Sequence, residues 1–215
     1  MDTGGRSGAG GTRSLLVCGV LAGPIYLAVG IAQGLLRDGF DFGRHPLSVL
    51  ANGPGGWVQT ANFVVTGLLV VAAAVGFQRA LQGTSRATGI FLGALGVSML
   101  VGAVCRADPM DGFPVGTPLG VPTSMSTRGL LHFAAGGVGF VALGVSCLIA
   151  SRAMSRRGER ALAQLSLVSG VIVLLGFFGG MAIPNSSPVL GIWIAVVVGF
   201  AWIALMSRRL SVTAA

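Results

Sequence analysis

Residues 14–36 read SLLVCGVLAGPIYLAVGIAQGLL, a run of 23 residues without a single Asp, Glu, Lys or Arg. A hydrocarbon core about 30 Å thick needs roughly 20 apolar residues of helix to cross it. In lipid, a helix satisfies its own backbone hydrogen bonds, which an open sheet cannot do. We therefore predict that this stretch is a membrane-spanning helix.

Further stretches along the chain have the same length and the same lack of charge. They are Trp57–Leu81, Arg86–Cys105, Arg128–Ser151, Ala161–Ile183 and Pro188–Met206. Charged residues make up only 9% of the chain, far below the roughly 25% of soluble domains. The sequence predicts an all-α membrane protein, a bundle of six transmembrane helices over residues 14–207. Residues 1–13 are Gly-rich and polar, so we expect a disordered tail there, and residues 208–215 form a C-terminal tail.

The first stretch also raises the question of a cleaved leader. It is longer than the apolar core of about 7–15 residues in a signal peptide, which favours a retained first helix. Gly30-Ile31-Ala32 resembles a cleavage site, so removal of this stretch remains the alternative.

The arginines predict the orientation. With the N-terminus in the cytoplasm, ten of the 14 arginines fall in inner segments and four in outer ones. Inner loops carry the excess of positive charge, so both termini should be cytoplasmic. The chain has arginine but no lysine, and 36 glycines; this composition suggests a bacterium, hence its inner (plasma) membrane. The charge of +8 is scattered among loops rather than gathered in a stripe, and we expect no nucleic-acid partner.

This topology leaves two long outer loops, Arg37–Gly56 and Arg106–Thr127. Pro46–Ala51 predicts a short helix, because proline suits a first helical position, and Asn52-Gly53 would end it. Ser126 or Thr127 would cap the fourth predicted helix. Glycine pairs four residues apart, Gly19/Gly23, Gly30/Gly34 and Gly89/Gly93, favour close helix packing within the bundle, with dimerisation as the alternative.

Polar residues gather near the outer ends of the predicted helices. Gln59, Asn62 and Thr66 share one helix face, and others stand at similar depth: Gln33, Arg106, Asp108, Arg128, His132 and Asn185. Polar side chains in hydrocarbon face the bundle interior or a wet cavity. We therefore predict an outward-facing polar pocket beneath the two loops. Interhelical hydrogen bonds that only stabilise the bundle are the alternative.

Asp108 and His132 are the candidate catalytic pair, because a carboxylate can orient a histidine and raise its basicity. No G-x-S-x-G motif accompanies them, and Ser48 is one of a few candidate serines. A structural hydrogen bond of Asp108 is the simpler interpretation. Arg128, His132 and the start of the fourth helix together form a candidate anion site for a phospholipid head group. The candidate ligand-binding residues are Arg128, Arg106, Asn62, Gln59 and Ser48.

The loop segments resemble a known family. Arg44–Ala51, Gly55–Gln59, Asn62-Phe63, Asp108-Pro109, Gly112–Pro114 and Gly129–His132 are similar to the membrane proteins of the domain-of-unknown-function 998 family. The resemblance implies a six-helix integral membrane protein and implies no reaction, so no catalytic residue is carried over.

These observations favour a protein that binds a lipid or a partner in the outer pocket. An outer-leaflet lipid hydrolase or headgroup transferase using Asp108 and His132, or a small-solute transporter, are the alternatives. Membrane lipids are the expected partners, with a protein partner or a second copy of the chain also open. No local ligand motif indicates a metal, and we predict neither a metal nor a cofactor.

Overall fold

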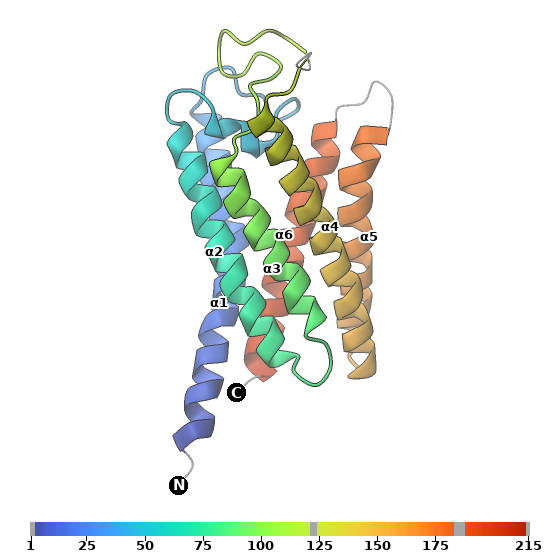
Figure 1. Ribbon diagram of the computed structural model, residues 1–215. Helices are drawn as coiled ribbons and strands as arrows, with labels where there is room; N and C mark the ends of the chain where they lie inside the picture. The colour runs from blue at the N-terminus through green and yellow to red at the C-terminus, as the bar shows by residue number, and fades with distance from the viewer. Residues whose placement is uncertain (1–2, 121–123, 183–187, 214–215) are drawn as a thin grey trace.

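The computed structural model describes residues 3–120, 124–182 and 188–213, and these residues form helices and loops (Figure 1). The predicted turn at Pro184–Ser187, with Asn185, lies outside them. The elements are α1 (Thr3–Leu35), η1 (Leu47–Ala51, a 3-10 helix), α2 (Gly56–Ala80), α3 (Ala87–Val104), α4 (Thr127–Arg156), α5 (Arg160–Ala182) and α6 (Pro188–Thr213). The six described α-helices are each long and apolar enough to cross a membrane. The predicted all-α fold with six spanning helices is confirmed.

The two ends of the chain differ from the sequence prediction. Helix α1 begins at Thr3, so most of the predicted disordered tail over residues 1–13 is helical. Extending a helix that already exists costs far less than starting one, and no proline interrupts residues 3–13. Helix α6 likewise continues to Thr213, through most of the predicted C-terminal tail.

The helices form a closed ring in chain order. Each helix packs against the next, and α1 closes the ring against α6. One end of the bundle carries the segments 36–55, 105–120 and 124–126, and we call it the loop end. Both chain termini lie at the opposite end, the termini end (Figure 1). Toward the termini end the interior is filled by large buried side chains, among them Phe77 and Trp202, whose rings lie 5.9 Å apart.

Glycines let the helices approach closely. A Cβ added to Gly96 of α3 would lie 2.8 Å from the carbonyl oxygen of Gly67 on α2. The predicted pair Gly19/Gly23 faces Ser207 and Phe200 of α6. The small residues thus serve packing inside this chain, as predicted from their spacing.

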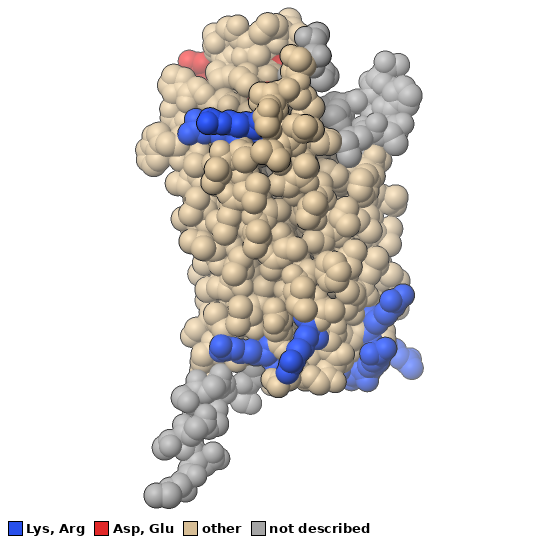
Figure 2. All heavy atoms as spheres, in the orientation of Figure 1, with Lys and Arg blue, Asp and Glu red and all other residues tan. Residues whose placement is uncertain are grey.

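Charged residues avoid the middle of the bundle. On the face shown in Figure 2, basic side chains gather at the termini end, and a broad band above them carries no charge. Eight arginines of this end lie near helix ends or in short turns: Arg79, Arg86, Arg152, Arg156, Arg157, Arg160, Arg208 and Arg209. An uncharged band between polar ends is the surface that a bilayer requires.

The two long loops join into one cap over the loop end. His45 is fully buried; its Nδ1 accepts the Asp41 backbone N–H at 2.9 Å, and its Nε2 lies 3.0 Å from the Asp111 carbonyl oxygen. Because Nδ1 accepts, Nε2 carries the proton and donates to that carbonyl. The side-chain amide of Asn52 donates to the Ala107 carbonyl at 2.9 Å. The first loop is therefore hydrogen-bonded to the second through both residues.

The predicted short helix in the first loop is confirmed as η1. Arg37 holds its end, donating to the carbonyl oxygens of Leu50 at 3.4 Å and Asn52 at 2.8 Å. The same guanidinium lies 5.1 Å from the centre of the Phe113 ring, in the second loop. Leu47, Val49 and Leu50 are buried beneath, so η1 forms the roof of the bundle interior.

Candidate functional site

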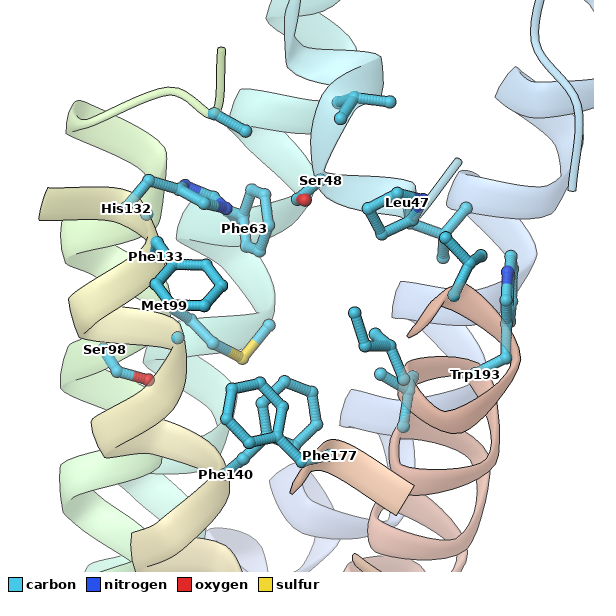
Figure 3. A pocket seen from close by; sticks show the side chains of 18 of the residues that line it. Leu47, Ser48, Phe63, Ser98, Met99, His132, Phe133, Phe140, Phe177 and Trp193 are labelled. Carbon is cyan, nitrogen blue, oxygen red and sulfur yellow. The ribbon is translucent and has the colours of Figure 1, made fainter. Parts of the chain in front are cut away.

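A cavity of about 430 Å³ lies between the helices at the loop end (Figure 3). That volume is within the range of small-molecule sites, about 300–1,000 Å³. All six described α-helices and η1 contribute side chains to its wall. Figure 3 shows His132 and Phe133 on α4 at one side, Trp193 on α6 at the other, and Phe140 with Phe177 below. The Phe140 and Phe177 rings stack with their centres 4.6 Å apart and form the floor.

The wall is apolar, which corrects the prediction of a polar pocket. Its larger side chains are Tyr26, Leu47, Phe63, Met99, Phe133, Phe140, Phe177, Trp193 and Phe200. The few polar side chains that accompany them are Ser48, Ser98, Asp108 and His132. An apolar cavity with a few polar groups is the usual make-up of a small-molecule site.

The polar face of α2 does not reach the cavity. Gln59, Asn62 and Thr66 are buried between helices. The Asn62 side-chain amide donates to the Tyr26 carbonyl of α1 at 3.0 Å and to the Gln59 Oε1 at 3.2 Å, while Thr66 donates to the Asn62 Oδ1 at 3.4 Å. Gln59 and Asn62 were predicted to bind ligand; in the structure they join α2 to α1 instead.

Asp108 is bonded to the start of α4 rather than to His132. Its Oδ2 accepts the Ser126 backbone N–H at 2.9 Å, and its Oδ1 accepts the Ser126 hydroxyl at 2.5 Å. The Ser126 Oγ accepts the Gly129 N–H at 3.0 Å, which confirms the predicted N-cap. Asp108 and Ser126 therefore form one capping unit, and Asp108 is not the residue that orients the histidine.

The predicted anion site at the start of α4 is filled by the protein itself. The Asp108 carboxylate already occupies this N-terminus, where the helix dipole and free N–H groups favour negative charge. Arg128 and Arg106 are exposed, and neither lines the cavity. The structure thus brings together two of the predicted site residues, His132 and Ser48, with Asp108 at the edge.

His132 is held by the backbone of α3. Its Nδ1 lies 2.8 Å from the Cys105 carbonyl oxygen, and the Phe63 ring lies edge-on to it, with ring centres 6.1 Å apart. A carbonyl can only accept, so Nδ1 carries the proton and the neutral ring has its lone pair on Nε2. His132 thus offers the cavity a hydrogen-bond acceptor with a fixed orientation.

Trp193 is a site residue that the sequence did not single out. It lines the cavity opposite His132 (Figure 3), and its indole Nε1 is buried without a hydrogen-bond partner among the described residues. A lone tryptophan in an apolar helix carries no distinguishing signal, which explains the omission. Across residues 3–120, 124–182 and 188–213, no three His, Cys, Asp or Glu side chains are grouped to hold a metal ion.

No curated protein and no solved structure matches the chain. One family model matches residues 20–209, which include every described helix at least in part and all the residues that line the cavity. The similarity first indicated by the loop segments therefore extends over most of the sequence, and the chain belongs to the family described as protein of unknown function (DUF998).

Proposed function

We propose that this protein binds a lipid in the cavity at its loop end. The observation that carries the proposal is the cavity itself: about 430 Å³ of space, walled by aromatic and aliphatic side chains, inside a helical bundle. Protein interiors are close-packed, and voids of this size are unusual. Lipid hydrocarbon is the apolar material that a membrane supplies to such a space.

Access to the cavity supports this choice. Met125 and Phe133 both line it, yet they are 53% and 50% exposed. A side chain that is both wall and surface marks an edge where the cavity meets the outside. Phe133 lies on a spanning helix, so a hydrocarbon chain would enter from the bilayer without crossing water.

We further propose that the loop end faces outward and that both termini are cytoplasmic. The arginines concentrated at the termini end support this orientation, because positive charge is retained on the inner side. The bound lipid would then come from the outer leaflet. A hydrolase using Asp108 and His132 is less well supported, since Asp108 is bonded to Ser126.

A larger side chain at Gly136 would fill part of the cavity and so test the proposal. It lines the wall on α4, and a Cβ added there meets nothing within 4 Å. Gly136→Leu should therefore project into the space occupied by the lipid without displacing protein atoms. Gly179→Leu on α5 is the matched control, because that glycine also has open space and does not line the cavity.

The measurement is native mass spectrometry of the three proteins purified in mild detergent. The proposal predicts a lipid of defined mass on the wild type and on Gly179→Leu, and its loss from Gly136→Leu. A lipid retained equally by all three proteins would show that binding occurs elsewhere. A bare polypeptide for the wild type would contradict the proposed function.

A further inference from the structure

We infer that the cavity selects a lipid whose head is uncharged and carries a hydroxyl group. This rests on the proposed function and adds the chemistry of the head. Lipid tails are as apolar as the cavity wall, so moving a chain from bilayer to cavity yields little hydrophobic free energy. Discrimination among lipids must then come from the few polar groups of the wall.

The first of these groups is His132. Because the Cys105 carbonyl holds the proton on Nδ1, the Nε2 of the neutral ring can only accept. A hydroxyl head supplies the donor that this atom lacks. A phosphate dianion or a carboxylate has only acceptor oxygens and would place a lone pair against a lone pair.

The charge of the wall also disfavours an anionic head. No Arg or Lys lines the cavity among the described residues, whereas Asp108 does. Among the arginines of the loops, Arg37 donates to backbone carbonyls, and Arg44 pairs with Asp41 at 3.2 Å and Asp111 at 3.7 Å. Arg106 and Arg128 are exposed and do not line the cavity. An anion would therefore give up its water without gaining a counter-charge.

One further group of the wall fits an uncharged, oxygen-rich head. The Ser48 hydroxyl lies at the η1 side of the cavity (Figure 3), has no hydrogen-bond partner among the described residues, and can donate or accept. Together His132 and Ser48 offer an acceptor and a group that can donate or accept, which matches the hydroxyls of an acylglycerol.

Two single-chain probes separate the head from the chain: 1-oleoylglycerol and 1-oleoylglycerol 3-phosphate. They share the acyl chain and the ester, and they differ only in the phosphate. The full-length protein, stripped of endogenous lipid in detergent, is offered both at equal concentration near pH 8, and retention is read by native mass spectrometry. We expect at least tenfold more retention of 1-oleoylglycerol. Equal or greater retention of the phosphate would overturn the inference.

Variants assign the selectivity to the named atoms. His132→Phe should lower the retention of 1-oleoylglycerol about fivefold, the effect of one hydrogen bond. The retention of the phosphate, which the wall already disfavours, should change less. Leu131→Ala is the control, since that neighbouring side chain is 50% exposed and lies outside this cavity. Ser48→Ala should also lower the retention of 1-oleoylglycerol. It breaks no hydrogen bond of the described chain, so it replaces the histidine variant if that variant does not fold.

The outcomes distinguish the two claims. If Gly136→Leu weakens both probes while His132→Phe and Ser48→Ala change neither, the cavity binds lipid and the head selectivity is wrong. If the wild type retains neither probe, the proposed function and this inference both fail.

Discussion

The role of Asp108 can be decided by a double-mutant cycle. The structure assigns this carboxylate to the cap of α4, where it accepts two hydrogen bonds from Ser126 at 2.5 and 2.9 Å. A catalytic role would instead couple it to His132. Asp108→Ala, Ser126→Ala and His132→Phe, singly and in pairs, separate these two accounts.

The expected magnitudes follow from the contacts. A hydrogen bond to a charged group contributes about 1.5–3 kcal/mol and an N-cap serine about 1 kcal/mol. Ser126 is exposed, and solvent weakens such contacts, so we take the lower end. Each single variant at Asp108 or Ser126 should lower the free energy of unfolding by about 1–2 kcal/mol. The coupling energy between them should be about 1 kcal/mol, and between Asp108 and His132 below about 0.5 kcal/mol.

The assay is equilibrium unfolding in SDS mixed micelles, followed by far-ultraviolet circular dichroism. Coincidence with tryptophan fluorescence checks that the transition is two-state. A coupling above about 1 kcal/mol between Asp108 and His132, with none between Asp108 and Ser126, would refute the capping assignment and restore the catalytic pair.

Three further predictions concern packing and the loops. Gly96→Leu should lower the free energy of unfolding by more than about 2 kcal/mol, because its Cβ would lie 2.8 Å from the Gly67 carbonyl oxygen. Gly179→Leu should lower it by less than about 0.5 kcal/mol. Similar SDS midpoints for both variants would contradict the close helix contact. His45→Phe keeps the tilted ring contacts with Phe40 and Phe113 but loses two hydrogen bonds. Amide exchange in residues 107–120 should therefore accelerate, and unchanged exchange would show that the two loops are not coupled. The Gly43 N–H and the Arg44 guanidinium hold the pKa of the Asp41 carboxyl below its ordinary value. The wild type should therefore be more stable than Asp41→Asn above about pH 4, and this difference should vanish as the pH falls further. A difference that persists in acid would contradict the prediction.

The fold could be predicted from the sequence because a backbone in lipid must satisfy its hydrogen bonds internally, which restricts spanning segments to helices and closed barrels. Uninterrupted apolar runs such as residues 14–36 must be helical in a bilayer. Local signals also predicted helix ends correctly. Pro46 precedes η1 and Asn52 follows it, and Ser126 caps α4. Each of these depends on residues a few positions apart.

The site was harder to predict from the sequence, because it depends on which side chains of different helices are in contact. Spacing placed Asp108 and His132 at one depth, but it could not show that Ser126, 18 residues from Asp108, would take the carboxylate. Polar residues on α2 pointed to a wet pocket, whereas Asn62 bonds to the backbone of α1. The cavity is a gap between packed helices, and such a gap has no sequence signature. Its aromatic wall looks like any apolar core until the helices are placed.

The most direct test of the central claim is an experimental structure of the protein in lipid nanodiscs. The account predicts continuous, chain-like density in the cavity between Phe140, Phe177 and Trp193, ending in a head within hydrogen-bond distance of the His132 Nε2. A cavity closed by inward movement of these side chains, or one holding only ordered water, would contradict it.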